Sequence, residues 1–315
     1  MLWLILLIIL SINTLHAYLQ KYLANRVSAT RITLAMFGVS FLVALFFQII
    51  IYQSLSINLF IPSIIGTAVI NALATWLFIQ AVRIHMVKST LIIPLTSAVS
   101  IALLAIFLDE WMFLDPKTLA GATLLMGVVF GLIAMFLFGG NSKKEKNINP
   151  DHRKWLILII MPILIWGFVN FLLKLFSTQE IATNIFLLSW YTGTMAGMLI
   201  ILGVSNFIKK IILKKDSAIK EEVLSDQQPT GKFIFPALII LGFLTIGSLG
   251  FFYYALNFGP GILVLSAEEI LKLTAGVLLG LFIFHERKEM RRRDWYGLGI
   301  GAAGIVNLII SSNLR

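Results

Sequence analysis

One apolar stretch, residues 261–284, is long enough to cross a bilayer as a helix but carries charged residues near its middle. These residues are Glu268, Glu269 and Lys272. A charge at membrane depth costs roughly 2.5–3.5 kcal/mol on insertion scales, so it persists mainly beside a cavity or a partner. On a helix, Lys272 follows the two glutamates at distances that let either carboxylate reach its ammonium group. We therefore expect these three side chains to form the substrate- or ion-binding site.

One lysine cannot neutralise both glutamates. The surplus carboxylate can take up a proton, bond another group or meet a cationic substrate, which predicts coupling to protons or cations. The alternative is a structural ion pair that only holds helices together, and the sequence leaves this open.

Other polar and aromatic side chains inside apolar stretches could line a cavity with this cluster. In the first stretch, helical spacing places Asn13 and His16 on one face. His16 could relay protons or simply pack against a neighbouring helix. Buried amides are as well suited to bonding a neighbouring helix as to binding a substrate. The candidates outside the central cluster are Asn13, His16, Trp76, Gln80, Trp166 and Asn170.

Several residues near the ends of apolar stretches are interpreted as interfacial. Tyr253 and Tyr254 could belong to an aromatic belt at the membrane surface or to the wall of a cavity, and their position near a span end favours the belt. Asp109 and Glu110 belong to an acidic connection on the predicted outer side. Lys174 is long enough to reach the nearby helix end and water. Lys174 is therefore not among the site candidates.

The composition is that of an integral membrane protein. Of the 315 residues, 59% are hydrophobic and only 13% are charged. The lack of cysteine excludes disulfides and thiolate chemistry, and the four histidines are scattered without ligand spacing, so no metal or other cofactor is expected. The basic residues lie between apolar stretches, which makes nucleic acid an unexpected partner despite the net charge of +10.

Apolar stretches of spanning length predict an all-α protein with ten transmembrane helices and membrane lipids around it. The run after Met1 continues to spanning length, so we expect it to be the first of these helices. The predicted spans are 2–20, 34–53, 59–82, 90–108, 117–139, 155–176, 183–208, 233–255, 261–284 and 295–312.

Basic residues concentrate in every second connection. Of the 25 lysines and arginines, 21 follow odd-numbered spans. The positive-inside rule then places these connections in the cytoplasm and both termini outside a cell membrane. The basic, polar segment 140–154 predicts a linker between two halves, 1–139 and 155–315, of five helices each.

The halves show weak self-similarity in matching order. The end of the third span at Ala81 corresponds to Ala255, and the acidic turn after the fourth span corresponds to Glu286. In this register Glu268 falls opposite Pro94, a helix-perturbing residue. Small residues two turns apart predict close helix packing in the final span of each half. The residues with expected structural roles are Pro94, Gly127, Gly297 and Gly304.

An odd number of helices per half requires the second half to be inverted relative to the first, which is the plan of many secondary transporters. With the repeated helix ends, acidic turns and paired small residues, the chain resembles the EamA domain of the drug/metabolite transporter superfamily over nearly its whole length. The resemblance implies a ten-helix transporter that moves amino acids, metabolites, sugars or drugs, often outward, by alternating access. Two features differ from that family: Glu268 and Glu269 replace an expected proline, and the family is often drawn with cytoplasmic termini.

The sequence therefore predicts a secondary transporter of a small metabolite or drug-like solute, with proton-coupled efflux through the carboxylates of the ninth span. No Gly-rich Lys-Ser/Thr loop for a nucleotide is present, so an ion or substrate gradient would supply the energy. A flippase for lipid or polyprenyl-linked substrates shares the architecture and remains an alternative. A membrane-embedded enzyme is disfavoured because no catalytic constellation appears at a recognisable spacing.

Overall fold

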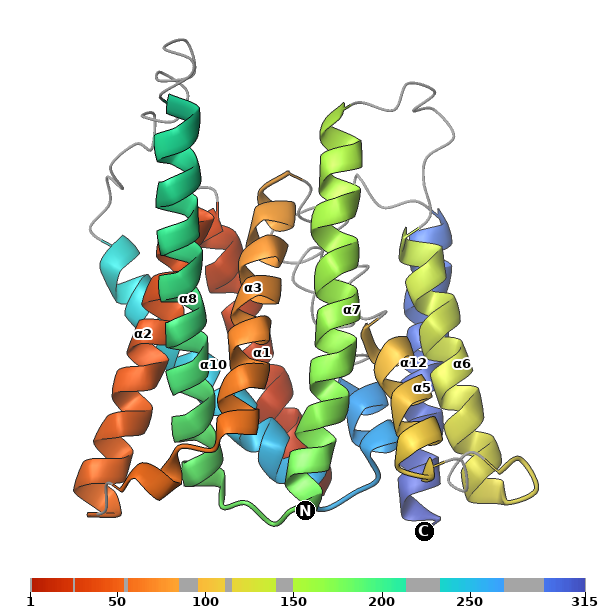
Figure 1. The fold of residues 1–315 in the computed structure, drawn as a ribbon. Helices are drawn as coiled ribbons and strands as arrows, with labels where there is room; N and C mark the ends of the chain where they lie inside the picture. Colours follow the sequence, from red (N-terminus) through yellow and green to blue (C-terminus); the bar gives the residue numbers. More distant parts are fainter. Residues whose placement is uncertain are drawn as a thin grey trace.

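The computed structural model describes residues 2–24, 26–53, 56–84, 96–110, 115–139, 150–213, 233–268 and 292–314. All regular structure in these ranges is helical (Figure 1). A further helix follows α10 and is described over residues 261–268, and α2 continues into the π-helical turn η1 (Phe47–Ile51). The main helices are α1 (Leu2–Ala24), α2 (Ala29–Phe46), α3 (Pro62–Ile84), α5 (Thr96–Phe107), α6 (Leu119–Gly139), α7 (Pro150–Thr178), α8 (Thr183–Leu213), α10 (Ile234–Leu256) and α12 (Arg292–Asn313).

Six of the described helices are long and apolar enough to cross a membrane, which is compatible with the predicted class. A lipid core offers no water to exposed amides and carbonyls, so apolar runs of this length satisfy their backbone as helices. Each of the ten predicted spans contains helix in its described part, but the count of ten stays a prediction. The six candidate spans are Leu4–Ala24, Ala29–Ile51, Pro62–Val82, Ile157–Thr178, Thr183–Val204 and Ile234–Leu256.

Local sequence sets several helix ends. Pro62 and Pro150 stand at the first positions of α3 and α7, where a missing backbone N–H costs nothing. The Ser28 side chain accepts a hydrogen bond from the Arg31 amide and caps the start of α2. Pro260 precedes the helix 261–268 and prevents α10 from continuing straight into it.

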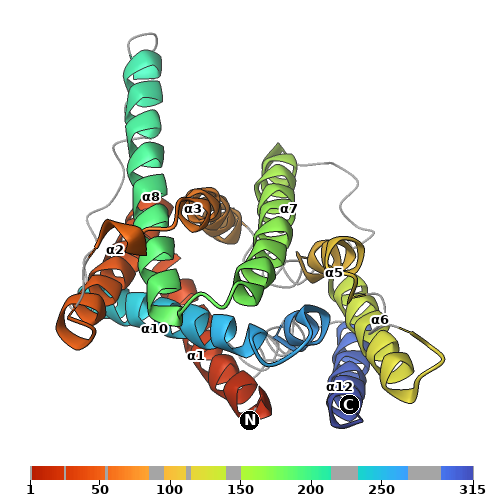
Figure 2. The same cartoon turned by 60° about the horizontal axis from the view of Figure 1, so that its bottom comes forward.

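The halves of the chain are interleaved. In the first half, α1 and α2 pack against α10, and α3 packs against α7 and α8. The helices α5, α6 and α12 gather on one side of the molecule, with α6 and α12 in extended contact (Figures 1 and 2). The start of α1 and the end of α12 lie at the same side of the helix layer (Figure 1). Contacts between halves therefore dominate the fold.

Small residues allow several of these helices to approach closely. The Ser40 hydroxyl of α2 lies 2.8 Å from the Gly242 carbonyl oxygen of α10. The Ser100 hydroxyl of α5 lies 3.0 Å from the Gly167 carbonyl oxygen of α7. A Cβ on either glycine would come within 2.5 Å of a valine Cβ in the facing helix. At both contacts a glycine lets two helices pack closely and a serine hydroxyl bonds across them, as is common between membrane helices.

Gly193 of α8 packs so tightly against α3 that adding one methyl group there should lower the stability of the protein. A Cβ on Gly193 would collide with the Ile65 backbone oxygen and lie 2.8 Å from Ala68 Cβ. We expect Gly193→Ala to destabilise the protein by about 1–3 kcal/mol through overpacking. Gly203 in the same helix has no atom within 4 Å of that position, so Gly203→Ala should leave stability unchanged or slightly raised. Thermal unfolding in detergent measures both; equal Tm values for the two variants would contradict the packing at Gly193.

Candidate functional site

The predicted central cluster falls partly within the described residues. Glu268 ends the described helix 261–268 and is buried, with 4% of its surface exposed. Ser266, one half-turn earlier, is also buried, and its hydroxyl oxygen has no hydrogen-bond partner within the described ranges. Glu269 and Lys272 lie outside the described residues, as does Pro94. The helix thus carries a carboxylate into the interior at the position where the sequence predicts the site.

The two candidates in α1 both contact α10. His16 Nε2 lies 3.2 Å from the Thr245 hydroxyl oxygen, and the Ser248 hydroxyl donates to Asn13 Oδ1 at 2.5 Å. Asn13 Nδ2 is buried without a hydrogen-bond partner in the part of the chain that the structure describes. The predicted common face of Asn13 and His16 is therefore a polar seam along α10.

The two candidate tryptophans each bond a neighbouring helix, and Trp166 forms a second polar seam between α7 and α3. Trp166 Nε1 of α7 donates to Asn71 Oδ1 of α3 at 2.9 Å, and its indole packs edge-on against Phe78 with ring centroids 5.2 Å apart. Trp76 Nε1 donates to the Thr30 hydroxyl of α2 at 3.1 Å. Both indoles hold helices together in this conformation.

The remaining candidates occupy interior or packing positions. Gln80 in α3 and Asn170 in α7 are partly buried. The predicted packing glycines Gly127, Gly297 and Gly304 are buried in α6 and α12, which contact one another extensively.

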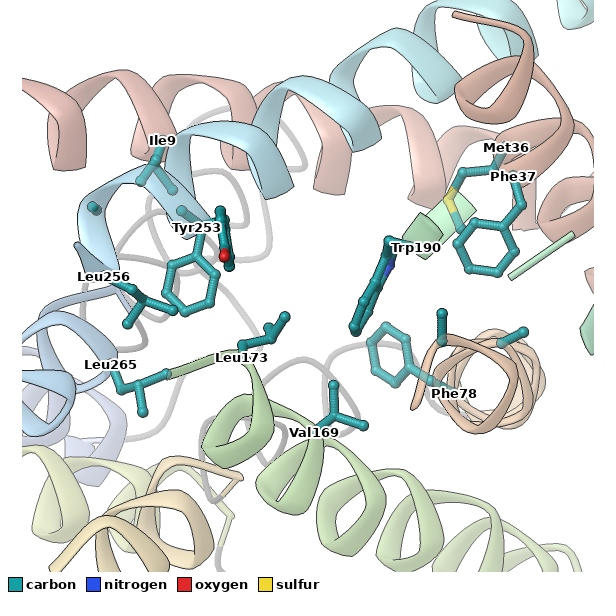
Figure 3. Close-up of a cluster of buried hydrophobic side chains, with 14 of the residues drawn as sticks. Ile9, Met36, Phe37, Phe78, Val169, Leu173, Trp190, Tyr253, Leu256 and Leu265 are labelled. Atoms are coloured by element: carbon teal, nitrogen blue, oxygen red, sulfur yellow. The ribbon is translucent and has the colours of Figure 1, made fainter. Parts of the chain in front are cut away.

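An aromatic cluster connects α8, α10 and the first half. Tyr253 stacks on Phe186 with ring centroids 3.8 Å apart, and Phe186 contacts Trp190 at 5.5 Å. Trp190 lies between Tyr253 on one side and Phe37 and Phe78 on the other (Figure 3). The belt interpretation of Tyr253 is wrong: the ring is fully buried, and its hydroxyl lies 3.1 Å from the Phe176 carbonyl oxygen. Tyr253 lies near the end of its span in the sequence, and this position alone gives no sign that α7 and α8 pack over its ring.

The structure also reveals a charged centre that the sequence interpretation missed. Both carboxylate oxygens of Glu110 accept backbone hydrogen bonds, from the Gly261 and Ile262 amides, each at 2.9 Å. Lys174 Nζ donates to the Leu256 and Gly259 carbonyl oxygens at 2.8 and 3.0 Å. Glu110 is buried, with 5% of its surface exposed, although the sequence gives it only as part of an acidic connection. Lys174, which is partly buried, thus caps the carbonyl end of α10.

One sequence signal pointed toward this centre. The Gly259–Pro260–Gly261 run ends one helix and starts another, which leaves backbone carbonyls and amides needing partners. Which side chains supply them depends on α5 and α7 lying beside that turn, and no local pattern gives this. Among the described residues, no group of acidic residues and histidines is placed to hold a metal ion.

Comparison with known proteins shows the fold but no family. No protein-family model and no curated protein matches the chain. Chains of solved structures do match it, and one, described as "Crystal structure of protein", aligns with 98% of this chain and 97% of its own length. The TM-score is 0.66 and the sequence identity is 14%. The chain therefore shares its overall helical fold, over nearly its entire length, with a protein of known structure.

Proposed function

We propose that the protein is a secondary transporter built from two inverted repeats, which moves a small metabolite or drug-like solute by alternating access. The observation that carries the proposal is a set of equivalent contacts between the two halves, with a buried carboxylate on a helix at their interface. Resemblance to the drug/metabolite transporter superfamily agrees with this architecture.

Equivalent positions in the two halves have equivalent partners. The register that aligns the ends of α3 and α10 also aligns Asn71 with Thr245. Asn71 bonds Trp166 near the middle of α7, whereas Thr245 bonds His16 in α1. The same register aligns Ala68 with Gly242, which face α8 and α2, respectively. This exchange of α1 and α2 for α7 and α8 is what a two-fold repeat predicts.

The orientation of the contacting helices supports inversion. Gln48, in the π-helical turn η1 that continues α2, accepts a hydrogen bond from Asn184, at the start of α8. Likewise, the Ser311 hydroxyl near the end of α12 donates to the Ala120 carbonyl at the start of α6. Both helix pairs are thus antiparallel, and each pairs corresponding spans of the two halves. An axis parallel to the membrane relates halves in this way.

In the proposed cycle, a carboxylate of the pair Glu268–Glu269 alternates between a proton or cation and the substrate. Burial removes the carboxylate from bulk water, so only a conformational change gives each side access in turn. The polar seams at Asn13, His16 and Trp166 lie at the interface between the halves, where inverted-repeat transporters bind their substrates. Substrate transport is then coupled to the proton or cation, because the same carboxylate binds either ligand but not both at once.

Flux measurements on reconstituted vesicles test the proposal. Solutes that stabilise the purified protein in a thermal-shift screen, starting with amphipathic amines and small organic anions, are offered to vesicles with an imposed pH gradient. Uptake above that of protein-free vesicles is the expected result. Transbilayer movement of a fluorescent phospholipid without solute uptake would favour the flippase, and product formation without vectorial movement would favour an enzyme. The absence of flux for every stabilising solute would contradict transport.

A further inference from the structure

Two helix ends of opposite polarity meet at one end of the protein. Helix α10 stops at Leu256, and the next helix starts at Gly261 after a short turn. The last carbonyls of a helix carry partial negative charge and the first amides carry partial positive charge. Lys174 bonds the carbonyls of Leu256 and Gly259, while Glu110 bonds the amides that start the next helix. Each charge therefore stands at the helix end that it stabilises.

The contact ties together segments that are distant in the sequence. Glu110 follows α5 in the first half, and Lys174 belongs to α7 in the second half. A Cβ on Gly261 would lie 2.9 Å from Leu104 Cδ1, 3.0 Å from Lys174 Cγ and 3.3 Å from Glu110 Oε1. The described surroundings are therefore tightly packed at this glycine.

Further hydrogen bonds join α10 to the chain around the end of α7. The Tyr253 hydroxyl of α10 lies 3.1 Å from the carbonyl oxygen of Phe176, in the last turn of α7, and 3.2 Å from that of Ile181, just after α7. Leu256, Ile262 and Leu263 are fully buried here, while Phe258 in the turn is exposed. These hydrogen bonds join α7, α10 and the helix at 261–268 at this end of the described structure.

The turn held by Glu110 and Lys174 leads directly into the helix that carries the candidate carboxylate. Ser266 and Glu268 are buried one to two turns along the helix whose first amides Glu110 holds. Alternating access requires that this interior be reachable from each side in turn. A contact between the first half and this helix start must therefore separate or move when the nearer side opens.

We propose that Glu110 and Lys174 form a latch that closes this end of the protein and has to release before the interior beside Glu268 opens to that side. The inference rests on the proposed transport function and adds the residues that control access to its site. Its structural basis is the capping of one interhelical turn by two charges, one from α7 and one from the segment after α5.

The natural absence of cysteine makes the latch directly testable. Ser266→Cys places a thiol of similar size where the hydroxyl oxygen has no partner in the described structure, so the probe breaks no observed bond. Phe258→Cys, at a side chain that is 47% exposed in the turn, identifies the vesicle face on which the latch lies. A membrane-impermeant cationic methanethiosulfonate is then applied from either face of reconstituted vesicles, without any substrate.

Glu110→Gln and Lys174→Met remove the charges but keep the shapes of the side chains, so folded protein is expected from both. Either variant should raise the modification rate at Ser266→Cys about tenfold or more from the face marked by Phe258→Cys. Hydrogen bonds to a charged group are strong enough to shift a two-state population by that factor. Asp109→Asn, a neighbouring exposed carboxylate, is the matched control and should leave the rate unchanged.

Unchanged rates in both latch variants would overturn the proposal. Equal increases from both faces would also overturn it, because they indicate general loosening and not the opening of one end. Since labelling requires no solute, either result would leave the transport proposal to be judged by flux alone.

Discussion

Replacing Glu268 with glutamine is expected to abolish pH-driven solute uptake, reducing it to the level of protein-free vesicles. Glutamine has nearly the same shape as glutamate but cannot exchange a proton or carry the negative charge that meets a cation. Glu268 is buried on a helix at the interface between the halves, so bulk water does not reach it to take over proton exchange. Initial rates of uptake at several external pH values, in vesicles containing equal amounts of protein, measure the effect.

Glu180→Gln is the control for this variant, since Glu180 is exposed in the turn between α7 and α8. It should retain the pH dependence of the wild-type protein. Glu269→Gln belongs in the same series because the sequence places it in the predicted cluster. If both Glu268→Gln and Glu269→Gln elute as folded protein and keep the wild-type pH dependence, carboxylate coupling in this helix is wrong.

Glu110→Ala should cause the largest loss of stability, about 3–5 kcal/mol. The substitution removes both acceptors from the Gly261 and Ile262 amides and leaves the Lys174 charge without its neighbouring carboxylate. The loss is this large because two buried amides lose their acceptor, and each unsatisfied buried group costs about 1–3 kcal/mol. Thermal or denaturant-induced unfolding in detergent would show the loss as a lower Tm or midpoint.

A double-mutant cycle separates the two charged groups. If Glu110 and Lys174 stabilise the same turn, Glu110→Ala with Lys174→Met should cost less than the two single changes together. Asp115→Asn, in the same connection as Glu110, should leave stability nearly unchanged since its side chain bonds only the local Lys117 amide among the described contacts. Simple additivity in the cycle would show that the two caps act independently.

The sequence predicted the helical segments with small boundary errors. The span predicted at 59–82 is α3 at Pro62–Ile84, and the one predicted at 233–255 is α10 at Ile234–Leu256. Hydrophobicity and backbone satisfaction are properties of each segment alone, so composition is enough to locate them. The interior position of Glu268 could also be predicted, because it stands within an apolar stretch. The shared face of Asn13 and His16 could be predicted because helical periodicity fixes which side chains face the same way.

Tertiary structure alone decided which groups meet. Tyr253, adjacent to a span end, is fully buried beneath α7 and α8, while its neighbour Tyr254 is 41% exposed. Glu110 finds its partners 151 and 152 residues further along the chain. A charged residue at the end of an apolar run looks the same in sequence whether water or a neighbouring helix end receives it. The difference arises from where α5 and α7 lie relative to the turn after α10, since hydrogen bonding and burial depend on distances between segments and not on the composition of any one of them.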